Sequence, residues 1–322
     1  DLAPDDPRTI AARERVDLIR RNANGAEFLE IGFGDGTTLL EASRAGFRAT
    51  GIDPTRGYLE NEVALKSSGA RIFTGALEDS GLPPGSFDVI ALFLVLEHVS
   101  DPRILIAQLR RLLNPKGALI VEVPDILNYA RQPTPSLLTA EHIFHYTRSP
   151  LRRIHAEFGF RLRNYISPSP KRSFASTAIF SVDSNNEEAP EPPPVPNQVV
   201  RRFRKYLNVL EKRHRKTTAD LIGLLQRHRR LAIFGAGSFA AGIVADLPAN
   251  VRNQIAVFID ETPAKRNCKF FGREILAPED VDFERLDAVA LAAETLSSVI
   301  AQKIHRRAPG LECHQLAQSP VD

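Results

Sequence analysis

Apolar and polar positions in the first 182 residues follow two alternating periods. Short apolar runs, the length of buried strands, alternate with segments whose apolar residues recur every three or four positions, as in helices. The predicted strands are 27–31, 48–52, 70–74, 87–93 and 118–123. The predicted helices are 13–21, 37–45, 59–68, 104–113 and 152–158. Such alternation favours a parallel, doubly wound α/β sheet.

Two later predicted strands, 160–166 and 173–182, have no helical segment between them. They predict an antiparallel hairpin at the end of the sheet, which then has seven strands and is mostly parallel. The first domain is expected to span residues 1–184.

A proline-rich stretch separates this domain from a second pattern of strands and helices. Prolines within Asn185–Asn197 forbid a helix or a sheet interior, so residues 185–198 are predicted to be a linker. A basic bridging helix is expected over 199–230. A smaller Rossmann-like α/β domain is then expected over 231–322, with strands near 231–234, 254–259, 288–292 and 311–315.

Composition and charge narrow the class of protein. An apolar share of 43% and a charged share of 25% are typical of a globular chain. Two cysteines cannot make a disulfide framework or a four-cysteine zinc site, and no metal is expected. The apolar runs are shorter than a membrane span, and Asp1–Thr9 is acidic and polar, unlike a signal peptide. A cytoplasmic location without a membrane partner is therefore expected.

Basic charge is concentrated in one segment. Residues 201–230 hold eleven Lys and Arg against two Asp and Glu, although the chain's net charge is only +3. Such a helix could bind nucleic acid or attract a nucleotide diphosphate. An apolar stripe runs along the same segment at helical spacing: Phe203, Leu207, Leu210, Leu221, Leu224 and Leu225. The favoured interpretation is therefore a domain-bridging helix with a solvated basic face.

A glycine loop follows the first predicted strand and indicates a ligand. Gly32, Gly34 and Gly36 permit a tight turn and close ligand approach, but their spacing departs from the dinucleotide pattern. Glu30 beside the loop would repel a diphosphate and suits an ammonium group. Asp53 ends the second strand, where a carboxylate can accept both ribose hydroxyls. A ligand with ribose and ammonium but no phosphate is S-adenosylmethionine; the alternative is a tight turn without a ligand.

Residues 25–165 resemble a class I S-adenosylmethionine-dependent methyltransferase. The matching motifs are the glycine loop, Gly-Ile-Asp-Pro (51–54), Gly-Ser-Phe-Asp-Val-Ile (85–90), Leu-Glu-His-Val-Ser-Asp-Pro (96–102) and Leu-Leu-Asn-Pro-Lys-Gly (112–117). At the third turn the family often has Gly-Asp, whereas this chain has Gly75-Ala76. The resemblance implies a cofactor site of Glu30, Gly32, Phe33, Gly34, Gly36, Asp53, Pro54, Ala76, Leu77, Glu78 and Phe93.

Candidate acid–base residues follow the fourth and fifth strands. Methylation of an oxygen or carbon acceptor requires loss of a proton, for which histidine is the natural base. His98 follows the fourth strand. Glu141, His142, His145 and Tyr146 lie in the long connection after the fifth strand, where a binding loop or lid is expected. The alternative is a capped helix entrance with solvated histidines.

The Glu-His-x-x-His-Tyr segment is similar to the Glu-His-x-x-Tyr-Phe segment of bacterial sugar C-methyltransferases. That resemblance implies that Glu141 and His142 contact the sugar, with His142 as the base. The second half is similar to their C-terminal domain in its basic helix, its Gly-Ala-Gly loop (235–237) and residues 258–265. This loop matches the dinucleotide pattern, but too few residues follow for a full Rossmann domain, so a half-Rossmann module is expected. Those enzymes usually begin with a cysteine-rich zinc module, which is not among these 322 residues.

These observations predict a methyltransferase that uses S-adenosylmethionine, yields S-adenosylhomocysteine and acts on a small molecule. A sugar or nucleotide sugar, methylated at carbon or oxygen, is the expected acceptor. One alternative is an RNA methyltransferase whose basic helix binds phosphates. The other is a non-catalytic cofactor-binding scaffold.

Overall fold

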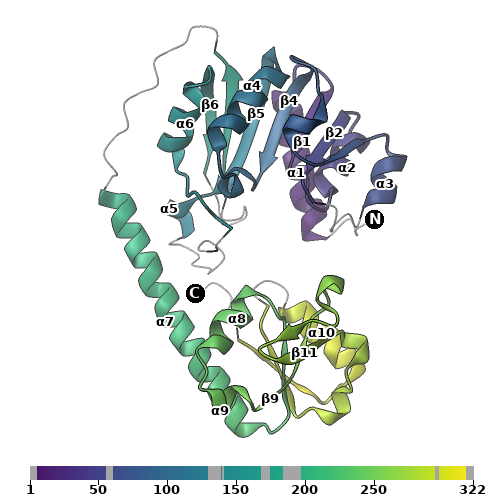
Figure 1. Ribbon diagram of the computed structural model, residues 1–322, viewed down its shortest axis with the longest axis vertical. Helices are drawn as coiled ribbons and strands as arrows, with labels where there is room; N and C mark the ends of the chain where they lie inside the picture. Colours follow the sequence, from purple (N-terminus) through teal and green to yellow (C-terminus); the bar gives the residue numbers. More distant parts are fainter. Residues whose placement is uncertain are drawn as a thin grey trace. The chain divides into compact units, whose positions relative to one another are not determined.

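The computed structural model describes residues 6–55, 61–129, 139, 141–167, 175–183, 197–293 and 297–316. The chain divides into two compact units, and among the described residues the division falls between Phe203 and Arg204 (Figure 1). The proline-rich linker expected over 185–198 lies almost entirely outside the described residues. No described helix combines the length and the apolar character that a membrane span requires.

The first unit contains a seven-stranded sheet in the order β3-β2-β1-β4-β5-β7-β6. Only β7 runs antiparallel to its neighbours, β5 and β6. The predicted α/β fold class, with its antiparallel hairpin at the end, is therefore confirmed. The strands are β1 (Glu27–Ile31), β2 (Arg48–Asp53), β3 (Arg71–Thr74), β4 (Phe87–Phe93), β5 (Leu113–Pro124), β6 (Phe160–Ile166) and β7 (Ala175–Val182).

Helices cover both faces of this sheet (Figure 1). The helices of the first unit are α1 (Pro7–Asn22), α2 (Thr37–Arg44), α3 (Glu62–Ser67), α4 (Pro102–Leu112), α5 (Ile126–Tyr129) and α6 (Arg148–Ala156). Two short 3-10 turns, η1 (Leu77–Ser80) and η2 (Leu96–His98), follow β3 and β4. Helices α1 and α4 each begin with an aspartate that accepts a backbone N–H, followed by proline, which is a favoured first helical residue.

Alternate residues of β4 face two separate cores. Ile90 and Leu92 pack in one cluster with apolar residues of α4 and α6. Val89 and Phe93 pack in the other, with residues of α1, α2 and α3. Because both faces are covered, the strand is nearly all apolar, with Asp88 as its one charged residue.

The start of β5 differs from the prediction. The segment 114–117 was expected to end a helix before a strand beginning at Ala118, but β5 begins at Leu113. The β4–β5 register shifts between Phe87 and Val89, which accommodates the additional residues. The Nδ2 of Asn114 donates to Oδ1 of Asp88 over 2.6 Å at this irregularity.

The second unit contains a six-stranded sheet in the order β10-β11-β9-β8-β12-β13. The second, smaller α/β domain that was expected is present, with strands on both sides of β8. The short strands β10 and β11 were not predicted. The strands are β8 (Leu231–Phe234), β9 (Ile255–Ile259), β10 (Lys269–Phe270), β11 (Arg273–Leu276), β12 (Ala288–Leu291) and β13 (Glu312–Gln315). Helix α7 (Asn197–Arg227) begins in the first unit and continues into the second, whose other helices are α8 (Ser238–Ala245), α9 (Ala249–Arg252) and α10 (Ser297–Arg307).

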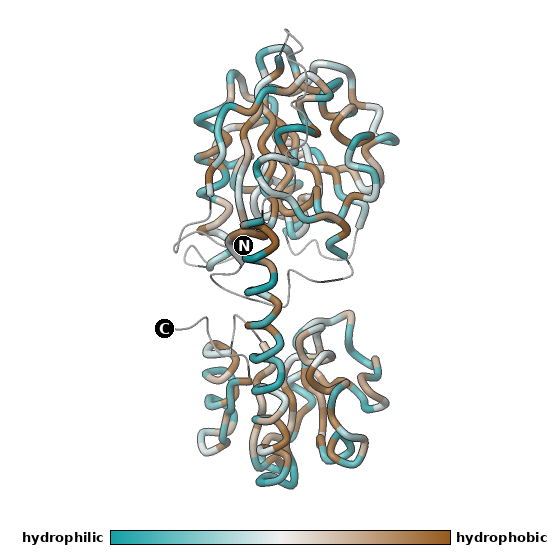
Figure 2. Tube along the Cα trace, turned by 90° about the vertical axis from the view of Figure 1, so that its left-hand side faces the viewer, coloured by the Kyte–Doolittle hydropathy of each residue, from teal (hydrophilic) through white to brown (hydrophobic). Residues whose placement is uncertain are grey.

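The long basic helix α7 is buried mainly near its C-terminal end. Leu221, Leu224 and Leu225 pack in the core of the second unit. Tyr206 is fully buried, whereas Leu207 of the predicted stripe is 40% exposed. Figure 2 shows this helix as alternating apolar and polar segments, while strands within each unit are apolar along much of their length.

Candidate functional site

The glycine loop joins β1 to α2 and leaves space beside one of its glycines. Gly34 has φ of +54°, and a Cβ at this position would have no protein atom within 4 Å. Gly32 and Gly36 also have positive φ, but a Cβ there would lie 2.5 Å from Val95 and Leu65, respectively. The glycines therefore differ: Gly34 borders open space suitable for a ligand, and the other two permit close packing within the protein.

Glu30 lies at the end of β1, buried to 2% exposure. Its Oε2 has no hydrogen-bond partner among the described residues. Burial raises the pKa of Glu30 to about 8; the positive charge of Arg15 opposes this shift, and the carboxylates of Asp35, Asp53 and Glu122 reinforce it. A buried carboxylate without a partner is costly, so this group suits a cationic ligand with an N–H donor.

Asp53 supports the glycine loop directly. Its Oδ2 accepts a hydrogen bond from the Gly34 amide at 3.0 Å. Its Oδ1 accepts bonds from the amide and hydroxyl of Thr55 at 2.8 and 2.7 Å. The carboxylate expected at a ribose therefore also determines the loop conformation, and Pro54 beside it is exposed.

The other predicted cofactor residues differ in burial and in the hydrogen bonds that their side chains already make. Those of Phe33, Leu77 and Phe93 are buried in the hydrophobic cores, and the Arg15 guanidinium stacks 4.5 Å from the Phe93 ring centroid. Ala76 is exposed at the start of η1. Glu78 accepts a bond from Nε2 of Gln108 at 2.8 Å, which lowers its pKa. The core positions thus leave only their backbone or an exposed ring edge for a ligand.

A cavity of about 400 Å³ lies in the first unit between α1 and the strands at the far end of the sheet. Its polar lining includes Glu14, Arg15, Glu122 and Thr177, and its apolar lining includes Ile10 and other aliphatic side chains. Arg15 forms an ion pair with Glu122 on its wall. This mixed lining and volume are suited to a small organic molecule.

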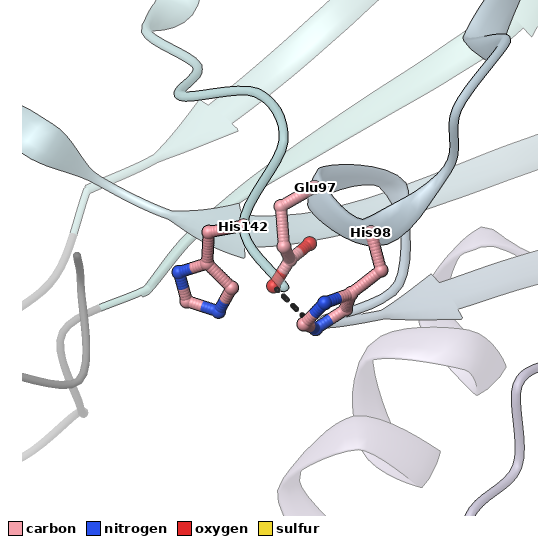
Figure 3. Close-up of side chains that lie close together, drawn as sticks. All are labelled: Glu97, His98 and His142. Carbon is pink, nitrogen blue, oxygen red and sulfur yellow. Dashed lines mark ion pairs between the residues drawn. The ribbon is translucent and has the colours of Figure 1, made fainter. Parts of the chain in front are cut away.

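The two histidines singled out after β4 and β5 lie together. The ring centroids of His98 and His142 are 4.9 Å apart. The loop is held against η2, because the Ile143 amide donates to the Glu97 carbonyl at 2.9 Å and Nδ1 of His98 bonds the Glu141 carbonyl at 2.9 Å. Figure 3 shows both rings on either side of the Glu97 carboxylate.

Glu97 is the residue of this cluster that the sequence analysis did not single out. It is 1% exposed, and neither of its carboxylate oxygens has a hydrogen-bond partner among the described residues. Burial raises the pKa of Glu97 to about 7, with the charge of Glu122 adding to the shift. Its only signal in the sequence was its position beside His98 at the end of an apolar strand.

The other predicted acid–base residues lie at the edge of this cluster. The side chain of Glu141 is exposed, and the carboxylate that faces His98 and His142 is that of Glu97. His145 is also exposed, and its pKa is lowered by loss of surrounding water and by His142. Tyr146 is 5% exposed with an unpaired hydroxyl, and burial together with the charge of Glu97 raises its pKa.

The glycine loop of the second unit is built differently. A Cβ at Gly235 would lie 2.9 Å from the Ala292 carbonyl oxygen, so this glycine is required by packing. Asp260 accepts bonds from the Ala236 amide at 2.8 Å and from Nζ of Lys265 at 2.7 Å. Burial alone would raise the pKa of Asp260, but its hydrogen bonds to Lys265 and Thr262 lower it. The carboxylate that could bind a ribose is therefore paired within the protein.

Comparison with known proteins finds similarity to methyltransferases over the first unit. Residues 7–165 match the family model described as a methyltransferase domain. The ubiquinone biosynthesis O-methyltransferase of Actinobacillus pleuropneumoniae is 33% identical over 116 residues, covering 33% of this chain and 50% of that protein. That of Aromatoleum aromaticum is 34% identical over 109 residues, covering 32% and 47%. The chain thus spans about half the length of these curated relatives.

Among solved structures, the magnesium protoporphyrin IX methyltransferase of Synechocystis, with bound S-adenosylhomocysteine, aligns with a TM-score of 0.44 and 17% identity. The alignment covers 55% of this chain and 83% of that one. The family match to residues 7–165 supports the expected methyltransferase domain. The two ubiquinone biosynthesis enzymes named above are O-methyltransferases, and the match to sugar C-methyltransferases stays a prediction.

Proposed function

We propose that the first unit is an S-adenosylmethionine-dependent methyltransferase that acts on a small-molecule acceptor. The observation that carries this proposal is Glu30, a buried carboxylate two residues before the first glycine of the loop, with an oxygen that lacks a hydrogen-bond partner among the described residues. The ammonium of the methionyl group supplies both the donor and the charge that this oxygen lacks. The methyltransferase-domain match over residues 7–165 supports the same cofactor.

The charge around the loop argues against a dinucleotide. Asp35, Asp53 and Glu122 act on Glu30 with the same sign, and Arg15 is the one opposing charge that influences it. A pyrophosphate would bring two more negative charges into this environment, whereas a sulfonium and an ammonium bring positive charge. S-adenosylmethionine therefore fits the site better than NAD.

The acceptor is a small molecule bound on the α1 side of the sheet. The cavity of about 400 Å³ lined by Arg15, Glu122 and Thr177 offers both charge and hydrogen bonds for a hydroxylated compound. The relatives named as O-methyltransferases support an oxygen acceptor. The resemblance of the Glu141–Tyr146 segment to sugar C-methyltransferases supports a sugar or nucleotide sugar, with His142 accepting the acceptor proton.

Calorimetry tests the cofactor first. S-adenosylmethionine and S-adenosylhomocysteine are expected to bind the full chain, and NAD is not. Glu30→Gln keeps the size of the side chain and removes its charge, so it should weaken binding by tenfold or more. Glu62→Gln is the matched control, because Glu62 is exposed on α3 and pairs with Lys66. NAD binding without S-adenosylmethionine binding would refute the proposal.

A methyl-transfer screen then tests the acceptor. Polyhydroxylated aromatic compounds and nucleotide sugars would be incubated with the enzyme and isotopically labelled S-adenosylmethionine, and labelled products identified by mass spectrometry. Label on a hydroxyl oxygen supports O-methylation, and label on a sugar carbon supports the sugar C-methyltransferase resemblance. Methylation of RNA instead, with strong salt dependence, would show that the acceptor is not a small molecule.

A further inference from the structure

Three side chains of the first unit converge at the carboxyl ends of β4 and β5 with the donor set of a metal centre. Glu97 and His98 come from η2, and His142 comes from the loop after β5 (Figure 3). Each contributes one oxygen or nitrogen atom, and these three atoms lie within 4.8 Å of one another. Two histidines and a carboxylate, with further positions open, are the ligand set of several catalytic zinc and iron sites.

The Glu97 carboxylate lacks the partners that such a buried group ordinarily has. Neither oxygen has a hydrogen-bond partner among the described residues, although the residue is only 1% exposed. The Nε2 of His98 is 3.9 Å from Oε1 of Glu97, which is too long for a hydrogen bond. A buried carboxylate that is not hydrogen-bonded is expected to be paired with a positive charge or bound to a metal.

His98 is already oriented to bind a metal. Its Nδ1 lies 2.9 Å from the Glu141 carbonyl oxygen, so Nδ1 carries the proton and donates this hydrogen bond. Nε2 is then free of a proton, and it lies 3.9 Å from Oε1 of Glu97. A backbone carbonyl that accepts the second N–H is the usual arrangement behind a metal-binding histidine.

We propose that Glu97, His98 and His142 bind a divalent transition-metal ion, Zn²⁺ being the first candidate. Zinc–ligand bonds of about 2.0–2.1 Å place tetrahedral ligands roughly 3.3 Å apart. The observed separation of 3.9 Å between Glu97 and His98 must therefore shorten by about half an ångström. His98 is 39% exposed and can make this adjustment by a small rotation.

The role of the metal rests on the proposed methyltransferase function. The ion's open position accepts the acceptor hydroxyl and lowers its pKa, so the proton leaves to water. The resulting oxygen anion forms a bond to the methyl carbon as the carbon–sulfur bond breaks, and S-adenosylhomocysteine leaves as a neutral thioether. A histidine that donates its lone pair to a metal cannot also be a base, so this inference replaces both the base role expected for His142 and the expectation of no metal.

Metal binding is tested apart from catalysis, by calorimetry of Zn²⁺ and by the visible absorption of Co²⁺ in the chelator-treated full chain. Glu97→Gln, His98→Gln and His142→Gln should each weaken Zn²⁺ binding by roughly 100-fold and abolish the Co²⁺ absorption of a low-symmetry site. His145→Gln removes a neighbouring histidine outside the cluster and should leave both unchanged. The other unit contains a second cluster of this kind, formed by His228, Glu312 and His314. His314→Gln disrupts that cluster, so that the number of Zn²⁺ ions bound can be assigned to each site.

The outcomes distinguish this inference from the proposed function. Zn²⁺ affinity unchanged in Glu97→Gln and His98→Gln overturns the metal site, even if S-adenosylmethionine still binds. Zn²⁺ binding that these variants remove supports the site, even if the cofactor does not bind. Circular dichroism checks each fold. Because Glu97 is buried, the more exposed His98→Gln variant decides the matter if Glu97→Gln does not fold.

Discussion

Binding of S-adenosylmethionine should release a proton from Glu30. Burial holds the pKa of this carboxyl at about 8, so at pH 7 it is protonated in roughly nine of ten ligand-free molecules. The ammonium of the cofactor binds the ionised form. A neighbouring positive charge lowers a carboxyl pKa by about 1–3 units, and the upper end of that range leaves Glu30 ionised at pH 7 in the complex. About 0.9 proton is therefore released per cofactor bound.

The same argument gives the pH dependence of affinity. At pH values below the Glu30 pKa of about 8, each unit by which the pH falls adds about 1.4 kcal/mol to the free-energy cost of ionising Glu30. Affinity should then rise roughly tenfold between pH 6 and pH 7. An α-amino group titrates near pH 7.7–8.0, so the ligand is still mainly cationic across this interval.

Calorimetry at pH 7 in two buffers with different ionisation enthalpies measures the protons released. In Glu30→Gln the release should fall to zero and the pH dependence should flatten. Wild-type binding without proton release, and with the same affinity at pH 6 and pH 7, would refute the reasoning about Glu30.

Three further predictions concern the same unit. Because the pKa of Glu30 is raised from 4.5 to about 8, the unfolded state loses this proton first, and stability falls as the pH rises between these two values. Glu30→Gln should therefore stabilise the ligand-free protein by up to about 3 kcal/mol at pH 7 and by almost nothing near pH 4.5. Thermal unfolding at the two pH values measures the difference. Gly34→Val should lower the free energy of unfolding by about 1–2 kcal/mol, because Gly34 has a positive φ, and should abolish cofactor binding. Gly237→Val, at a φ of −104°, should leave cofactor affinity unchanged. Equal losses of cofactor affinity in the two variants, measured by calorimetry, would contradict the different roles given to the two glycine loops. His142→Ala should lower turnover by about 10²–10⁴-fold with little change in cofactor affinity. Chelator treatment should abolish the turnover of the wild-type enzyme, and added Zn²⁺ should restore it. Full activity of the metal-free enzyme would exclude a catalytic metal and leave His142 with the base role alone.

Local periodicity was sufficient to predict most elements of the fold. The strands Glu27–Ile31, Phe87–Phe93 and Phe160–Ile166 begin and end at the predicted residues. Of these, Phe87–Phe93 is nearly all apolar, as expected of a strand buried on both faces, and a single sequence displays that pattern directly. The two-residue strand β10 (Lys269–Phe270) carries no such period, and β11 (Arg273–Leu276) is nearly as short, so neither was predicted.

The acidic residues beside the glycine loop of the first unit could also be predicted from the sequence. Glu30 and Asp53 stand at the ends of successive strands, and parallel strands place such ends at one edge of a sheet. The direction in which each side chain points could not be predicted. Phe33 and Leu77 occupy motif positions, yet their side chains pack in the hydrophobic cores.

The cluster of Glu97, His98 and His142 depended on the tertiary structure. More than forty residues separate His98 from His142, and the hydrogen bonds that join their segments run through backbone atoms of Glu97 and Glu141, which carry no sequence signal. Sequence neighbours indicated Glu141 as the partner of His142, but the carboxylate that faces both rings belongs to Glu97. Periodicity is a property of neighbouring residues, whereas a site assembled from two loops is determined by how the sheet brings their ends together.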